Sequence, residues 1–301
     1  MTLKAPAAMV INWPRRRTFS RFGRFSARPD ASPEKQIRKL EAYFDEAKAY
    51  QRARQSDAEY PIDARLEAML PVLKGEIPML VTADDVEQIQ AAVAFAAARN
   101  LKLIIYGGYD APDCAALLKQ QNVPVIVSAI YRTPRRRDDP VDAPYTIPAR
   151  LHAHGIRFSI AGTGRFGASM LRNLPYHAGT AAAHGLDRDQ ALRAVTISAA
   201  EIIGAADRIG SLEVGKDASL IVTDGDPLEI TTHVLAAYIQ GRAVDLNDRH
   251  KQLWRKYQQK YDRQDSEGLA SPGETLPDRK RKSEGDVSLL DPPLLDQPSH
   301  Q

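Results

Sequence analysis

Cysteine is nearly absent from this chain of 301 residues, and histidine is confined to its second half. The one cysteine, Cys114, excludes a disulfide framework within the chain and a zinc cluster that needs several thiolates. No histidine precedes His152. Residues 1–151 therefore cannot supply a pair of imidazoles to a metal ion.

Long apolar runs are also missing, because no stretch approaches the roughly 18 apolar residues of a membrane span. The net charge is only +3, and 43% hydrophobic with 26% charged residues is typical of a globular protein of one or two domains. We therefore expect no membrane partner. The sequence as written favours the cytoplasm, but the compartment stays open because a signal peptide could be encoded upstream.

The first 33 residues form a basic segment. Lys4 and six arginines occur before any acidic residue, interleaved with Phe19, Phe22 and Phe25. This pattern is found in transit peptides and in RNA-binding arms, so a basic-armed nucleic-acid binder is one hypothesis. The apolar start A-A-M-V-I-N-W-P instead resembles interior chain, and nucleic acid is therefore the less favoured partner.

From Ser32-Pro33, a helix-start signal, the chain alternates between helical and strand patterns. Amphipathic helices are predicted over 34–54 and 62–73. Predicted strands follow at 77–81, 101–106, 123–127 and 156–160, with helices at 85–99, 111–120 and 145–154 between them and at 169–185 after the last. This order predicts an α/β domain over 34–205, with a parallel sheet covered by helices.

The residue pattern of the sequence changes after residue 205. Residues 206–247 are turn-rich with short alternating strands, and they predict a small β segment. A charged helix is predicted over 248–263. Residues 264–301 are dominated by Ser, Pro, Gly, Asp and Lys, and predict a disordered tail.

One long segment resembles a known family. The run A-L-R-A-V-T-I-S-A-A-E-I-I-G-A-A-D-R-I-G-S-L-E-V-G-K-D-A-S-L-I-V-T-D-G-D-P-L (191–228), followed by I-Q-G-R-A-V-D, resembles the C-terminal signature of the amidohydrolase superfamily, in its imidazolonepropionase-like and dipeptidase-like branch. The four predicted strands resemble barrel strands five to eight. The resemblance covers about residues 55–260 and implies a partial (β/α)8 TIM barrel, followed by one part of a composite β-sandwich.

The resemblance also implies a chemistry, namely metal-dependent hydrolysis of carbon–nitrogen bonds in small amides or cyclic amides. Family enzymes hold one or two divalent metals such as Zn²⁺ at the C-terminal ends of the strands, where the metal activates a water molecule. The implied ligands are a His-x-His on strand one, a carboxylated Lys or a Glu on strand four, and histidines after strands five and six. An Asp after strand eight handles the proton.

This chain departs from that pattern at every position that can be checked. Thr82 stands where the histidine after strand five is expected, and Gly107 where the one after strand six is expected. Gly164 occupies the position of the catalytic Asp, and no His-x-His precedes it on a strand. A threonine hydroxyl is a poor ligand for zinc. We therefore assign no catalytic or metal-binding residue, and expect the chain to be incomplete or catalytically impaired.

Three residues remain candidates for the substrate side: Arg165, His177 and Tyr106. Arg165 lies in G-T-G-R-F-G, a glycine-rich loop whose N–H groups could bind a carboxylate, although the glycines also serve a loop that simply turns. His152 and His154 form the one closely spaced pair, in L-H-A-H-G. They precede a strand instead of following one, so we expect them on a helix surface.

Four strands cannot close a barrel of eight, so the predicted sheet leaves edges that invite pairing with another chain. We expect a truncated family member, with a complementing chain or a homo-oligomer as its partner. Three functions stay open: a C–N hydrolase that needs completion, a non-catalytic relative that binds a small molecule or a partner, and the basic-armed nucleic-acid binder.

Overall fold

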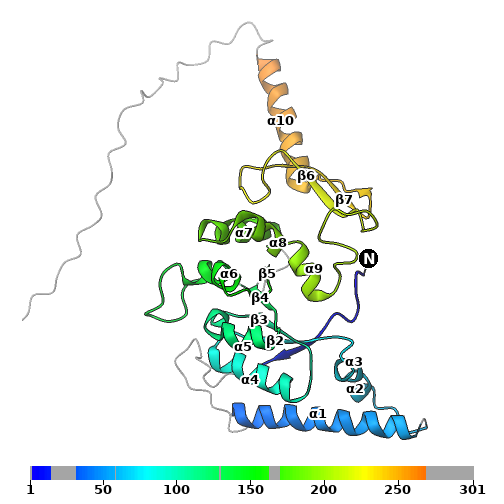
Figure 1. Ribbon diagram of the computed structural model, residues 1–301. Coiled ribbons are helices and arrows are strands. Elements are labelled where there is room, and N and C mark those ends of the chain that lie inside the picture. The colour runs from blue at the N-terminus through cyan, green and yellow to red at the C-terminus, as the bar shows by residue number, and fades with distance from the viewer. Residues whose placement is uncertain (1, 15–31, 58, 129, 163–169, 269–301) are drawn as a thin grey trace, which may run out of the picture. The chain divides into compact units, whose positions relative to one another are not determined.

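The computed structural model describes residues 2–14, 32–57, 59–128, 130–162 and 170–268, the last five without their side chains (Figure 1). The chain divides into two compact units, Met1–Asp245 and Leu246–Gln301. None of the helices described combines the length and the apolar composition of a membrane span. The basic stretch at 15–31 and the predicted tail beyond residue 268 lie outside the described residues.

The first unit is built on a five-stranded sheet. Its strands, in spatial order, are β1 (Met9–Asn12), β2 (Met79–Ala83), β3 (Leu103–Gly107), β4 (Val125–Ser128) and β5 (Phe158–Ala161). All four neighbouring pairs are parallel. This confirms the predicted α/β class and parallel sheet, but the expectation of four strands was wrong, because β1 is a fifth. Its four residues are too few to show a period, and its partner lies far away in the sequence.

Nine α-helices accompany this sheet in the described part of the first unit. They are α1 (Pro33–Ser56), α2 (Ala64–Glu67), α3 (Leu70–Leu73), α4 (Val86–Ala98), α5 (Ala115–Gln120), α6 (Ala143–Ala153), α7 (Leu174–Ala183), α8 (Arg188–Ala194) and α9 (Ile197–Ile203). Four of them begin at a residue whose side chain caps the helix, namely Ser32, Asp63, Asp85 and Asp187. The Ser32 hydroxyl accepts a hydrogen bond from Lys35 N at 3.3 Å, and Asp85 forms a capping box with Gln88. The helix predicted over 169–185 is shorter, because a 3-10 turn (Leu171–Asn173) precedes α7.

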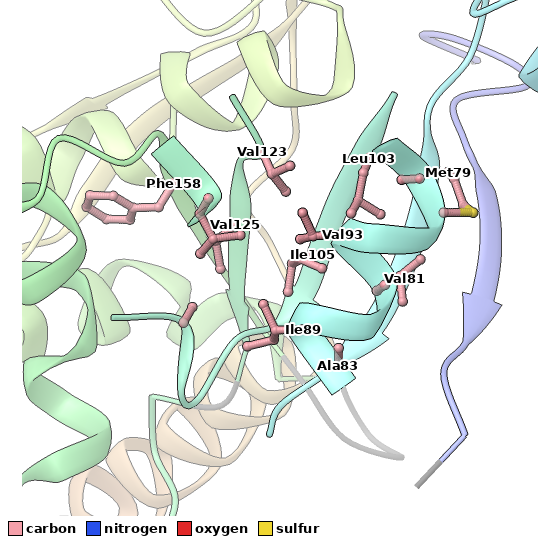
Figure 2. Packing of buried hydrophobic residues seen from close by; sticks show 14 of the residues in the cluster. Met79, Val81, Ala83, Ile89, Val93, Leu103, Ile105, Val123, Val125 and Phe158 are labelled. Atoms are coloured by element: carbon pink, nitrogen blue, oxygen red, sulfur yellow. The ribbon is translucent and has the colours of Figure 1, made fainter. Parts of the chain in front are cut away.

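One face of the sheet, called the outer face here, carries the main core. Side chains at alternate positions, among them Val81, Ile105 and Val125, are fully buried. Figure 2 shows them pointing toward α4, which contributes Ile89 and Val93. Burying each side chain of this size contributes roughly 1.5–3 kcal/mol, so the packing of the helices on the outer face is what holds this unit together.

The opposite, inner face has much less cover. Val10 on β1 is 65% exposed, and its register partner Leu80 on β2 is half-buried. A small cluster joins Ile104 and Ile126 to Ile202 of α9. In the described part of the chain, α9 is the helix that supplies a buried side chain to this face, so the inner face is closed only locally.

A second, antiparallel sheet follows, with strands β6 (Leu220–Thr223), β7 (Val234–Ile239) and β8 (Arg242–Ala243). The loop between β6 and β7 lies close to helix α7. A Cβ added to Gly179 of this helix would lie only 2.6 Å from the Leu228 carbonyl oxygen. The second unit contains helix α10 (Arg249–Gly268), which continues beyond the predicted end at residue 263.

We expect Ile105→Ala to lower the free energy of unfolding by about 2–5 kcal/mol, because it leaves a cavity between β3 and α4. Val141→Ala is the matched control, since Val141 is 83% exposed and should change stability by no more than about 0.5 kcal/mol. Urea unfolding followed by circular dichroism measures both. Equal losses would mean that the outer-face core is not the main source of stability.

Candidate functional site

The C-terminal ends of the strands lie along one edge of the sheet, because all five strands run in parallel. At this edge the chain places seven charged residues, which we call the Arg–Asp cluster. They follow β2 (Asp84 and Asp85), β3 (Asp110) and β4 (Arg132, Arg135, Arg136 and Asp139). The cluster is the largest concentration of charge that the strand ends bring together among the described residues.

The firmest pair in this cluster is Asp110 with Arg136. The Asp110 side chain is only 2% exposed, and both of its carboxylate oxygens accept hydrogen bonds from the guanidinium of Arg136, one at 2.9 Å. Asp110 also accepts a hydrogen bond from Val86 N at 3.2 Å, which ties it to the start of α4. A carboxylate held in this way has a structural role, because three hydrogen bonds already engage its two oxygens.

The other carboxylates of the cluster also face arginines. Arg135 lies 2.8 Å from Asp85 and 3.5 Å from Asp84, and Arg132 lies 3.7 Å from Asp84. The Arg132 guanidinium stacks 4.4 Å above the ring of Tyr109.

The Tyr109 hydroxyl donates a hydrogen bond to Asp139 at 2.6 Å. Burial, reinforced by this bond to a carboxylate, raises the pKa of Tyr109, and the same bond lowers the pKa of Asp139. At neutral pH the phenol therefore stays protonated and the carboxylate charged, which keeps the loop after β4 attached to the end of β3.

A divalent metal ion does not fit these residues. Three guanidinium groups stand among the carboxylates and would repel a cation at short range. Within the described ranges, no group of three His, Cys, Asp or Glu side chains could hold a metal ion. Cys114 is buried, and burial raises the pKa of its thiol to about 11, so it offers no thiolate. The donor set at the described strand ends is therefore not that of a zinc site.

Two residues singled out by the sequence lie side by side. Thr82 on β2 and Tyr106 on β3 are register partners, and both are half-buried on the inner face. The register continues from Thr82 to Asn12 on β1, which is exposed. We call these three neighbours the polar row. They bring a carboxamide, a hydroxyl and a phenol onto three adjacent strands near the C-terminal ends. Adjacent strands of a sheet lie about 4.8 Å apart.

Gly107 is a glycine for a structural reason. Its φ of +112° is a conformation that other residues rarely adopt, and an added Cβ would lie 2.7 Å from Asp84 Oδ1 and 3.0 Å from the Ala83 carbonyl oxygen. The end of β3 therefore approaches the end of β2 too closely for a side chain. A histidine could not stand here unless the backbone and Asp84 moved.

His177 lies apart from the polar row, in α7. Its ring is 7% exposed and stacks on Tyr131, with ring centroids 4.2 Å apart and planes 28° from parallel. Its Nδ1 is buried and has no hydrogen-bond partner. Burial lowers the pKa of this histidine, so the ring is neutral at pH 7. Gly164 and Arg165 lie outside the described residues, and their predicted places stay untested.

Sequence reasoning missed Asn12 and the Arg–Asp cluster. Asn12 was overlooked together with its strand. The cluster had a visible signal, since Y-R-T-P-R-R-R-D-D-P (131–140) is a charge run directly after a buried strand. His152 and His154 are exposed at the C-terminal end of α6, where the sequence predicted them.

The parallel sheet, covered by helices on its outer face and carrying its polar groups at the C-terminal strand ends, is an arrangement typical of barrel-type α/β enzymes. The model of the amidohydrolase family matches residues 80–249, more than half of the chain, and the chain belongs to this family.

Two relatives are imidazolonepropionases. The one from Mesorhizobium japonicum is 29% identical over 182 residues, which cover 60% of this chain and 40% of the relative. The one from Sphingopyxis alaskensis is 32% identical over 125 residues, covering 40% of this chain and 29% of the relative. Among solved structures, an amidohydrolase from Thermotoga maritima MSB8 is 26% identical with a TM-score of 0.67, over 80% of this chain and 63% of that one. The chain thus spans less than half the length of the curated relatives it matches.

Gly107→Ala should be more destabilising than Gly215→Ala. Both residues have a positive φ, +112° and +96°, so each substitution carries the backbone cost of roughly 1–3 kcal/mol. Gly215 has no atom within 4 Å of an added Cβ, whereas Gly107 meets Asp84 and Ala83, which should add about 1–3 kcal/mol of overpacking. Urea midpoints compare the two variants. Equal losses of stability in the two variants would show that the ends of β2 and β3 can move apart without a cost in free energy.

The buried His177 should make the protein less stable in mild acid. Its folded-state pKa lies below the ordinary value of 6.5, so the unfolded chain binds a proton more readily, and stability falls as pH drops below about 6.5. His177→Gln should show a smaller loss between pH 7.5 and pH 5.5, measured as the change in urea midpoint within each protein. His152→Gln, at an exposed position, should behave as the unsubstituted protein does. An unchanged slope in the His177 variant would contradict this expectation.

Proposed function

We propose that this chain, as it stands, is a catalytically impaired member of the amidohydrolase family that binds a small amide or cyclic amide on its inner face and does not hydrolyse it unaided. The observation that carries the proposal is the polar row. Asn12, Thr82 and Tyr106 are adjacent across three strands near the edge where this family works, and none of them is a histidine.

The polar row suits an amide for reasons of hydrogen bonding. The carboxamide of Asn12 both donates and accepts, so it can pair with the N–H and the C=O of an amide at once. The hydroxyls of Thr82 and Tyr106 can donate to a carbonyl oxygen. Tyr106 also presents an aromatic ring, which favours a flat ligand such as a cyclic amide. Similarity to imidazolonepropionases supports this ligand class.

The groups beside the row support the proposal of impaired catalysis. Gly107 has no room for an imidazole, and Asp84 and Asp110 are engaged by arginines. The positive charge of these arginines disfavours a metal ion at either carboxylate and lowers the tendency of the carboxylate to accept a proton from water. The row orients a ligand, while the groups that would attack it are not found among the described residues.

A second candidate function is C–N hydrolysis by an assembly in which further polypeptide completes the barrel. It is favoured by the open edges of the sheet at β1 and β5. The resemblance implies that a His-x-His would come with such polypeptide, on the strand beside β5. The whole activity would then belong to the assembly and not to residues 1–301.

The test combines metal content, turnover and binding. After incubation with Zn²⁺ and desalting, we expect the protein to retain far less than one ion per chain and to leave N-acyl dipeptides and cyclic amides intact. The Mesorhizobium japonicum imidazolonepropionase, assayed alongside, controls the reagents. One bound ion per chain with turnover that a chelator abolishes would overturn the proposal.

Binding is tested by calorimetry with a series of small cyclic amides. Thr82→Val and Tyr106→Phe should each weaken the binding of a cyclic amide by roughly 0.5–1.5 kcal/mol, since each removes one hydrogen bond. Tyr60→Phe, at an exposed position away from the sheet, should leave it unchanged. Equal affinity in all three variants would place the ligand elsewhere.

A further inference from the structure

Helix α10, orange in Figure 1, carries a stripe of large apolar side chains along one side. The members of the stripe recur at intervals of three and four residues, which places them on one helix face: Leu253, Trp254, Tyr257 and Tyr261. Every side chain from Arg249 to Arg263 is exposed, and Trp254 is exposed to 65%. The stripe is therefore open to a partner.

Positive charge borders the stripe on both sides. A helix of 3.6 residues per turn places four cations along the border at Leu253 and two along the border at Trp254. In that order they are Arg249, Lys256, Lys260 and Arg263, and then Lys251 and Arg255. These six cations and the single carboxylate of Asp262 give residues 249–263 a net charge of +5, with histidine neutral. Asp265 and Glu267 come only after the last aromatic residue.

The helix begins at its own cap. The Asp248 carboxylate accepts a hydrogen bond from Lys251 N at 2.9 Å, and Lys251 Nζ donates one to the Leu246 carbonyl oxygen at 2.9 Å. Isolated short helices are at best marginally stable in water, and helices in proteins gain most of their stability by packing an amphipathic face. Because α10 is highly charged outside the stripe, the stripe is the face on which such packing is possible.

We propose that α10 docks onto an anionic lipid surface and lies along it with the aromatic stripe in the headgroup layer. Trp and Tyr rings prefer this layer, because it accepts an apolar ring together with a polar N–H or O–H group. The Lys and Arg side chains of both borders then reach the anionic headgroups, while their methylene stems cover the edges of the stripe. The expectation of no membrane partner rested on the lack of a spanning run, which a helix lying in the surface does not need.

Two other occupants fit the charges less well. A second copy would bring another stretch of charge +5 to the same interface, so that the cations along the borders would face like charges. A nucleic-acid strand would satisfy the cations of one border. A lipid layer presents anions to both borders and an apolar zone to the stripe between them, and it therefore matches the whole face.

Tryptophan fluorescence provides the test, because the chain has two tryptophans and Trp13 is only 5% exposed. The full chain is titrated with vesicles of phosphatidylcholine containing one-third phosphatidylserine, and with vesicles of phosphatidylcholine alone. With the anionic vesicles only, we expect the emission to shift to shorter wavelength and quenching by acrylamide to fall. Added salt should weaken this binding by screening. Trp254→Phe should abolish the shift, and a shift that persists in this variant would contradict the proposal.

Two double variants with the same change in net charge separate docking by α10 from general attraction. Lys256→Gln with Lys260→Gln should lower the affinity for the anionic vesicles, measured by cosedimentation, by about tenfold or more, since each cation near such a surface contributes about fivefold. Arg38→Gln with Lys39→Gln, at exposed positions of α1, should lower it by less than about twofold. Trp254→Ala should lower it by about tenfold. All five positions are exposed, so these variants should unfold in urea as the unsubstituted chain does.

Several results would overturn the proposal. Two are an absence of binding to the anionic vesicles and equal losses in the two double variants. A dimer that Trp254→Ala dissociates, seen by light scattering, would assign the stripe to a second copy, and tighter binding of a single-stranded oligonucleotide at the same salt would assign it to nucleic acid. Shielding of Trp254 from acrylamide before vesicles are added would show that the chain itself covers the stripe. The readout involves no amide ligand, so it is independent of the proposed function.

Discussion

The parallel pairing of five strands is the constraint on which the rest of this structure depends. Because the strands share one direction, their C-terminal ends meet at one edge, and segments more than a hundred residues apart contribute to the same site. Because the strands are pleated, successive side chains point to opposite faces of the sheet. Outward side chains such as Val81 and Ile105 pack against α4, whereas their neighbours in sequence, Thr82 and Tyr106, face inward.

This division separates the main core from the polar groups at the strand ends. Thr82 lies on the inner face, so the identity of this residue leaves the packing on the outer face intact. At the strand ends, arginines neutralise the buried carboxylates. Asp110 is compensated by Arg136 in a part of the protein where an unpaired carboxylate would be costly.

Local patterns in the sequence predicted much of the fold and little of the site. The Ser32 cap, the capping residue Asp85 and the apolar runs of β2 to β5 are encoded within a few residues, so their elements could be predicted. Strand β1 could not, because M-V-I-N becomes a strand only through pairing with residues 79–82. The Arg–Asp cluster depends on three separate strand ends, and the closeness of Gly107 to Asp84 depends on the separation of two strands. Such features arise from tertiary geometry, which a linear pattern does not contain.

The geometry of the strand ends also limits how a metal site could be formed there. An imidazole at position 82 would enter beside Asp84, whose carboxylate already faces Arg132 and Arg135. A cation there would have to displace these guanidinium groups or bear their repulsion, and the glycine at position 107 allows no second imidazole without a shift of the backbone. The arginines and the close strand ends form one consistent arrangement, in which the local charge is compatible with a ligand that hydrogen-bonds along Asn12, Thr82 and Tyr106 and is not compatible with a bound metal ion.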